Sequence, residues 1–193
     1  PREVVIDTNG NGVGIADELI RTQVDFDGEE YGPIGFINDA HYSKIQPKDA
    51  PRLAYSFKAG SSINSEMYGI IYSRINAGLV DFCIKEQDAR GKLLSTKKGQ
   101  KMGLEERTRI LMPYEATTKL FEQMGNLRLK RTGSGTDIVL ERINTRFPKD
   151  KFSALGMGLY VIKGHEDQNA KRHKRLSSNG TRKMVFFTGA GGR

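Results

Sequence analysis

The sequence predicts an α/β fold. Three observations indicate it: a β-branched run near the start is followed by a glycine-rich turn and a helix-like pattern, strand and helix patterns then alternate, and the last strong pattern is a helix. The 193 residues are enough for one sizeable domain with its own core. We expect a single domain over residues 1–168 and a basic tail over residues 169–193.

The opening stretch, Glu3 to Leu19, predicts a strand, a loop and a helix. Val4, Val5 and Ile6 form the strand, Asp7 ends it, and a GNGVG turn leads into apolar residues at helical spacing. An acid at the carboxyl end of such a strand faces the crevice where open α/β sheets bind ligands. Asp7 is therefore a candidate site residue. The alternative is that its side chain only caps the turn.

The middle of the chain contains one clear helix between less regular segments. A second strand is predicted over residues 34–37, and residues 40–57 are predicted to be irregular because they contain Pro47 and Pro51.

The helix is predicted to begin at Asn64 and end at Gly78. Residues 79–84 predict a short strand or an extended segment, with Cys83 expected to be buried, and the lysine-rich residues 85–101 predict an exposed loop.

The last third of the chain predicts helices around a hairpin. Residues 104–111 fit a helix or an extended piece, and a new helix is expected to open at Pro113. Two alternating segments, residues 127–130 and 138–141, predict a hairpin across TGSGTD.

The final helix is predicted to run from Asp150 to Gly164. Its internal Gly156 and Gly158 indicate close packing, because each weakens an isolated helix by roughly 1 kcal/mol.

The chain is basic, with a formal charge of +8 and a pI of about 9.6. Its lysines and arginines concentrate in residues 92–101, 128–131 and 171–175, and no aromatic-rich amphipathic helix or membrane-length apolar run accompanies them. This pattern favours a nucleic acid, DNA or RNA, over an anionic membrane surface as the partner. The candidate DNA-binding residues are Lys97, Lys98, Arg128, Lys130 and Arg131.

Two acids at element ends, Asp7 and Asp150, are the candidate catalytic and metal-binding residues. If they converge, their charges are relieved by hard divalent cations with oxygen ligands. Two Mg²⁺ or Mn²⁺ ions about 4 Å apart can activate water and stabilise the leaving oxygen of a phosphodiester. The three histidines, His41, His165 and His173, are scattered and have no metal-ligand spacing, so a zinc site is not expected.

Three segments, in order, resemble the nuclease domain of the large terminase subunit of tailed bacteriophages. They are VVIDTNGNGVGIADEL, NSEMYGIIYSRINAGLVDF and KDKFSALGMGLYVI, and the resemblance extends from residue 3 to about residue 163. It implies a ribonuclease H-like fold, with a mixed central sheet flanked by helices, and a two-metal endonuclease that cuts concatemeric viral DNA during packaging. It also implies a terminase ATPase motor domain, a small terminase subunit and a portal protein as partners. The implied location is the host bacterial cytoplasm, with transient docking on the procapsid.

The match to this family is partial. Asp7 matches the acid that ends the central strand, and Asp150 matches the acid that opens the last helix. The family's first acid lies on an earlier strand, which we expect this chain to lack, and Ser153 stands where many relatives carry a further acid. Asp39 and Glu66 are the nearest acids that could substitute.

Two further functions stay open from the sequence. One is a catalytically silent DNA-binding or motor-docking module of the same fold, and the other is a different ribonuclease H-like nuclease such as a resolvase or an integrase. The sequence contains no GxxxxGK[ST] motif, so the ATP-hydrolysing motor is not expected within it.

Overall fold

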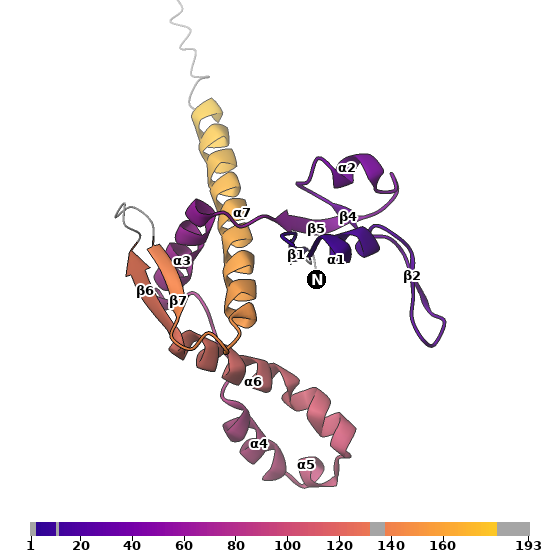
Figure 1. Cartoon of the computed structure of the whole chain (residues 1–193), viewed down its shortest axis with the longest axis vertical. Helices are drawn as coiled ribbons and strands as arrows, with labels where there is room; N and C mark the ends of the chain where they lie inside the picture. The colour runs from indigo at the N-terminus through magenta and orange to yellow at the C-terminus, as the bar shows by residue number, and fades with distance from the viewer. Residues whose placement is uncertain (1–2, 11, 132–137, 181–193) are drawn as a thin grey trace, which may run out of the picture.

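A small parallel sheet with helices on both faces lies at the centre of the protein (Figure 1). The computed structural model describes residues 3–10, 12–131 and 138–180. The sheet contains β1 (Val4–Asp7), β5 (Arg52–Phe57) and β4 (Gly35–Phe36) in the order β1-β5-β4, and both pairings are parallel. Together with seven helices in the described part of the chain, this sheet confirms the α/β class.

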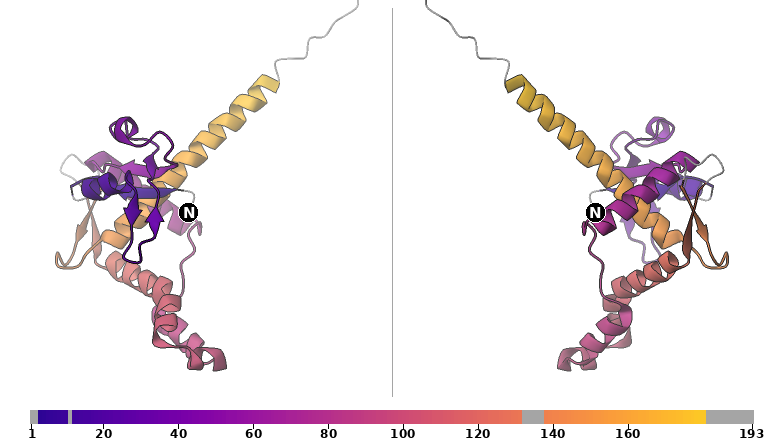
Figure 2. Two further views of the ribbon diagram at one scale, coloured as in Figure 1. Left: turned by 90° about the vertical axis from the view of Figure 1, so that its right-hand side faces the viewer. Right: turned by 90° about the vertical axis from the view of Figure 1, so that its left-hand side faces the viewer.

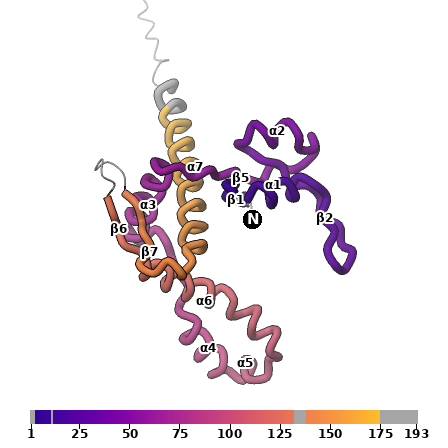
Figure 3. The backbone as a smooth tube through the Cα atoms, viewed as in Figure 1, coloured from indigo at the N-terminus to yellow at the C-terminus, as the bar shows by residue number. Residues whose placement is uncertain are grey.

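One face of the sheet is covered by α1 (Gly12–Leu19) and the short α2 (Tyr42–Ile45). Ala16, Phe36, Tyr42 and Ala54 form a buried cluster there, and the rings of Phe36 and Tyr42 stack with centroids 4.4 Å apart. A two-stranded ribbon, β2 (Gln23–Val24) and β3 (Glu30–Tyr31), follows α1 and extends away from the sheet (Figures 1 and 3).

The other face carries the larger core, formed with α3 (Ser61–Asn76) and α7 (Asp150–Gly180). Its buried side chains come from β5, α3 and α7: Phe57, Met67, Tyr68, Ile70, Ile71, Phe152 and Leu159. The predicted close packing is confirmed at Gly156, where an added Cβ would lie 2.7 Å from Sδ of Met67 and 2.9 Å from Cδ1 of Ile71. At Gly158 the same atom would meet nothing within 4 Å.

The expectation that residues 40–57 are irregular was wrong. They contain α2 and then β5, the middle strand of the sheet. Pro51 lies just before β5, where the missing N–H of proline removes no hydrogen bond from the sheet. Its carbonyl oxygen still accepts a hydrogen bond from the backbone N–H of Gly35. The buried residues of β5 are Ala54, Ser56 and Phe57, and because two of the three are small, the segment has no strong apolar signal in the sequence.

The expected loop over residues 85–101 is instead helical. It forms α4 (Glu86–Leu94) and α5 (Lys97–Lys101), which fold back along α6 (Leu104–Gly125) in an arm that extends away from the start of α7 and the hairpin (Figures 2 and 3). Helix α6 is continuous, so the helix expected to open at Pro113 begins nine residues earlier. Residues 79–84 form no strand, which leaves the alternative of an irregular extended segment, and Cys83 is exposed rather than buried as expected.

The C-terminal third confirms the predicted hairpin and lengthens the predicted helix. Strands β6 (Leu127–Arg131) and β7 (Ile138–Arg142) pair antiparallel, and the backbone N–H of Ile138 donates to Ser65 Oγ of α3 at 2.9 Å. Helix α7 continues past Gly164 to Gly180, so the first part of the expected tail is helical, while residues 181–193 lie outside the described residues. No described helix has the length and apolar character needed to cross a membrane.

The contact at Gly156 leads to a stability prediction. We expect Gly156→Val to lower the free energy of unfolding by about 1–3 kcal/mol more than Gly158→Val, because only the first side chain is forced into the α3–α7 contact. The two variants share the same residue change within one helix, so propensity effects cancel. Urea unfolding followed by circular dichroism measures the difference, and equal losses would contradict the close approach of the two helices.

Candidate site at the carboxyl edge of the parallel sheet

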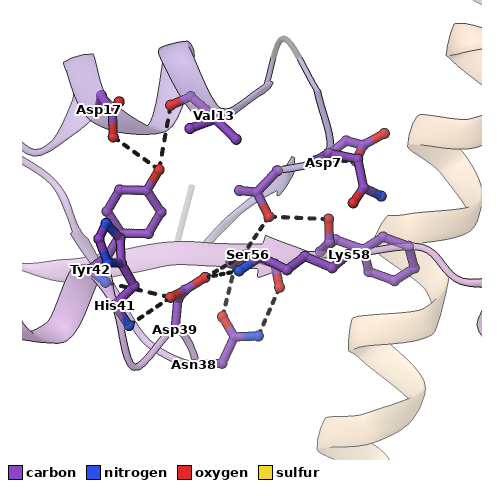
Figure 4. Close-up of polar contacts among 12 residues, drawn as sticks. Asp7, Val13, Asp17, Asn38, Asp39, His41, Tyr42, Ser56 and Lys58 are labelled. Carbon is purple, nitrogen blue, oxygen red and sulfur yellow. Dashed lines mark hydrogen bonds and ion pairs between the residues drawn. The ribbon is translucent and has the colours of Figure 1, made fainter.

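The carboxyl ends of the three parallel strands bring polar residues together at one edge of the sheet (Figure 4). Asp7 ends β1, Lys58 follows β5, and Asn38 and Asp39 follow β4. This is the edge at which open α/β sheets bind ligands. Asp39, considered from the sequence only as a spare acid, lies at its centre.

Asp39 is buried and accepts hydrogen bonds through both carboxylate oxygens. Oδ2 accepts from the Ser56 hydroxyl at 2.9 Å and from Lys58 Nζ at 2.9 Å. Oδ1 accepts from the backbone N–H groups of His41 at 2.9 Å and Tyr42 at 3.4 Å. The Asp39 carboxylate, which has about four acceptor sites, thus accepts hydrogen bonds from four donors of this chain.

The environment of Asp39 favours its charged form. The Lys58 ammonium, followed by the Ser56 hydroxyl and the two backbone donors, lowers the pKa of Asp39 to about 2, although burial acts in the opposite direction. The side chain of Asp39 is only 6% exposed, whereas that of Lys58 is 60% exposed and reaches the carboxylate from the solvent side. Asp39 is thus an anion whose charge Lys58 already neutralises.

Thr8 and Asn38 extend this network to the neighbouring strand ends. The hydroxyls of Thr8 and Ser56 are 2.7 Å apart, and Thr8 is buried. The side-chain amide of Asn38 donates to Ser56 O and accepts from Ser56 N, both at 2.8 Å, and so continues the ladder beyond the end of β4. Neither Thr8 nor Lys58 is a candidate from the sequence. Lys58 follows a segment that the sequence predicts to be irregular, so its place at a strand end is not evident.

Asp7 is exposed and makes the turn contact that the sequence left open as an alternative. Its Oδ1 accepts the backbone N–H of Asn9 at 3.0 Å. Within the described residues no hydrogen bond reaches its other oxygen, Oδ2. The turn is tight: Gly10 has a φ of +57°, and a Cβ on Gly12 would lie 1.6 Å from the carbonyl oxygen of Asp7.

A cavity of about 530 Å³ opens beside this edge. Asp39, His41 and Lys58 line it on the sheet side, and Ile63 and Tyr160 line it on the side of α3 and α7. Burial, and then the nearby Glu66 carboxylate, raises the pKa of Tyr160, so its hydroxyl stays protonated at neutral pH. Glu66, the second spare acid, is exposed on α3 and lies near the Tyr160 hydroxyl.

The structure does not bring Asp150 to this edge. Tyr160 contacts Phe57, the cross-strand neighbour of Asp7, with ring centroids 5.5 Å apart. Asp150 lies ten residues earlier on α7, which corresponds to about 15 Å along the helix axis. It lines a different cavity, with Glu122 and Lys151.

The candidate DNA-binding residues lie on two separate elements. Lys97 and Lys98 are exposed on α5, at the far end of the arm, whereas Arg128, Lys130 and Arg131 lie on β6 (Figure 1). Arg128 donates to Glu141 Oε2 at 3.0 and 2.8 Å, and Lys130 lies 3.8 Å from Oε1 of the same residue. Of the histidines, His165 pairs with Glu3 at 2.8 Å, and His173 is exposed on α7.

The donor set at the sheet edge fits one hard cation better than two. Asp7 offers a free oxygen in a solvent-accessible turn, and Mg²⁺ commonly binds one or two carboxylates and keeps several waters. Asp39 fits as a ligand only if Lys58 leaves it. Among the described residues, no group of three or more histidine, cysteine, aspartate or glutamate side chains is placed to hold a metal ion.

The Asp39 network generates a pH-dependent stability prediction. Asp39→Asn should lower the free energy of unfolding at neutral pH by about 2 kcal/mol, because it leaves Ser56 and Lys58 without their acceptor. The folded-state pKa of about 2 lies below the ordinary value of 3.8. The stabilisation is therefore full above about pH 4 and disappears as the pH falls toward 2.

Urea unfolding of both proteins across this range measures the effect. The difference between wild type and Asp39→Asn should shrink at acidic pH, while Asp49→Asn, which removes an exposed acid, should change the unfolding free energy little throughout. A constant difference between pH 7 and pH 3 would contradict the assigned network.

The Asp7 turn generates a second prediction. Gly12→Ala should distort the turn and destabilise the protein, because backbone atoms of Asp7 occupy the space that the Cβ needs. Gly14→Ala is the matched control in the same helix, since its Cβ meets nothing within 4 Å and should stabilise α1 by up to about 1 kcal/mol. Thermal unfolding compares the two, and a Gly12→Ala protein as stable as Gly14→Ala would refute the tight turn.

Three comparisons with known proteins, against family models, curated proteins and solved structures, found no match to this chain. Its function is therefore inferred from its own residues and from the resemblance of its segments.

Proposed function

We propose that the chain is a metal-dependent DNA endonuclease domain with Asp7 as its metal-binding carboxylate. The observation that carries this proposal is the position of Asp7 at the carboxyl end of a parallel strand, with one oxygen held in a turn and the other without a hydrogen bond to any described residue. A Mg²⁺ or Mn²⁺ ion bound there would supply Lewis-acid chemistry toward a phosphodiester. The residues of the chain hold the carboxylate in place through the Asn9 N–H and the Gly12 turn.

The resemblance of three segments to terminase nuclease domains supports the same activity and extends it to DNA packaging. On that basis we propose a ribonuclease H-like core, concatemeric double-stranded DNA as substrate, and work beside an ATPase motor domain, a small terminase subunit and a portal protein in the bacterial host. Asp150 belongs to this proposal as the second acid that matches the family, although its side chain lies on another cavity in the isolated chain.

A second candidate is a DNA-binding module without catalysis, and the Lys58–Asp39 ion pair favours it. A lysine that neutralises the central carboxylate of the edge does for Asp39 what a cation would otherwise do. A protein of this kind would keep the fold and the basic surface while losing the need for a metal.

The experiment that separates the two is cleavage of supercoiled plasmid by the purified chain with Mn²⁺, with Mg²⁺ and with EDTA. We expect metal-dependent nicking that Asp7→Ala abolishes while its urea midpoint stays close to that of wild type, because Asp7 is exposed. Asn9→Ala is the matched control on the same turn, since it removes a neighbouring side chain but keeps the N–H that holds Asp7.

Asp150→Ala and Lys58→Gln complete the series. Loss of cutting by a folded Asp150→Ala protein would assign this acid to the active assembly, as the resemblance implies. If Lys58 blocks a ligand, Lys58→Gln should lower the Mn²⁺ concentration needed for half-maximal cutting. Absence of cutting with every metal, together with retained DNA binding, would favour the silent module.

A further inference from the structure

The positive charge of this protein is concentrated in its last 26 residues. After Asp167 the sequence contains seven lysines and arginines and no aspartate or glutamate, compared with a formal charge of +8 for the whole chain. The preceding residues, up to Asp167, therefore have almost balanced charges. The basic clusters that the sequence shows earlier, on residues 92–101 and 128–131, are offset by acids elsewhere in the body.

This charged segment begins on the part of α7 that leaves the body of the protein. Up to His165 the helix packs against α3 and β1, and the contact ends with Arg74 paired to Glu166 and His165 paired to Glu3. From Glu166 to Lys174 every residue is exposed. Figures 1 and 2 show this part of α7 projecting alone, on the side opposite the α4–α6 arm. From Asp167 to Gly180 the projection is about 20 Å long.

The acidic residues of α7 at the start of the projection form ion pairs with basic residues. Glu166 pairs with Arg74, and Asp167 accepts from Lys163 at 2.8 Å. Beyond them, residues 171–174 (KRHK) follow one another at about 100° around the helix, which places Lys171, Arg172 and Lys174 on three different sides of it. On the hairpin, Glu141 lies against both Arg128 and Lys130, and these two cations lower the pKa of Glu141.

We propose that the projecting part of α7, from Asp167 onward, binds the phosphate backbone of double-stranded DNA. We call this part of α7 the basic arm, as distinct from the α4–α6 arm. The inference rests on the proposed DNA-directed function and names its main binding element. A densely charged phosphate backbone attracts lysine and arginine at any point around a helix, and releases counterions as each phosphate is neutralised.

The composition of the projection opposes the other anionic partners. Between Glu166 and Lys174 the only apolar side chain is that of Ala170, so these nine residues have no face to bury in a bilayer. They also offer no aromatic or large aliphatic anchor of the type that dominates protein–protein interfaces, and the first large aliphatic residue of the projection is Leu176. Contacts to phosphate need neither.

The test compares three sets of charge removals in the full chain, each replacing three basic residues by glutamine. The arm variant changes Lys171, Arg172 and Lys174, the hairpin variant changes Arg128, Lys130 and Arg131, and the control changes the exposed Lys44, Lys48 and Lys85. Binding to a labelled DNA duplex is measured in EDTA at several salt concentrations, so cleavage does not enter. Circular dichroism checks that helicity is unchanged.

We expect the arm variant to weaken binding most and to reduce the slope of log K against log salt by about two to three, close to one unit per lost phosphate contact. The hairpin variant should lose less, and the control least. An arm variant that binds DNA with wild-type affinity and slope would overturn the proposal, as would a hairpin variant with the larger loss.

Two further experiments test the identity of the partner. Wild-type protein that binds an RNA duplex more tightly than the DNA duplex would overturn the assignment to DNA. Vesicles of phosphatidylcholine and phosphatidylserine test the membrane, and an arm variant that loses vesicle binding but not DNA binding would also overturn it. Because Asp7→Ala should retain this DNA binding, a failure of the proposed catalysis is distinguishable from a failure of the arm.

Discussion

The hydrogen bonds that Asp39 accepts hold the carboxyl edge of the sheet together. Strand β4 contains only two residues and β1 only four, so backbone ladders alone fix little at this end. Asp39 connects the segment after β4 to Ser56 of β5, and Ser56 connects to Thr8 after β1. Because these groups are buried, each lost partner carries a desolvation penalty, and the three strand ends are held in one arrangement. The position of Asp7 depends on it.

The same network limits the chemistry of the edge. Lys58 stabilises Asp39 as an anion and at the same time removes it from the acids available to a cation. Asp7, one residue from Thr8, remains solvent-exposed and has an open oxygen. The structure thus separates two carboxylates of one edge into a structural anion and an available ligand, which is how a fold assigns different roles to identical groups.

Patterns that depend on local chemistry could be predicted from the sequence, and patterns set by tertiary packing could not. The β-branched Val4–Asp7 strand, the Gly78 stop and the hairpin were predicted because each has a strong local signal. Strand β5 was missed because it follows a proline and two of its three buried residues, Ala54 and Ser56, are small. Helix α4 was missed because it packs on α6 and buries only Ala89.

For the site, the acid at the end of a strand was predictable, whereas its neighbours were not. Asp7 was identified from its place after an apolar run, and its hydrogen bond to Asn9 is the local alternative that the sequence itself offered. Convergence with Asp150 is a long-range property that no local pattern contains. The structure separates the two acids, since α7 meets β1 and β5 near Tyr160 rather than at its first turn, where Asp150 lines a cavity of its own.

The separation of the basic arm from the carboxylate edge follows from the electrostatics of both. A lysine close to Asp7 would pair with it, as Lys58 does with Asp39 and Arg128 with Glu141, and would reduce both its affinity for a cation and the charge available for phosphate. Placing the positive charge on a projecting helix avoids this mutual neutralisation. The two proposed functions are compatible in one chain because α7 takes part in both: its first half builds the core beside the edge, and its second half leaves the body beyond the paired Glu166 and Asp167.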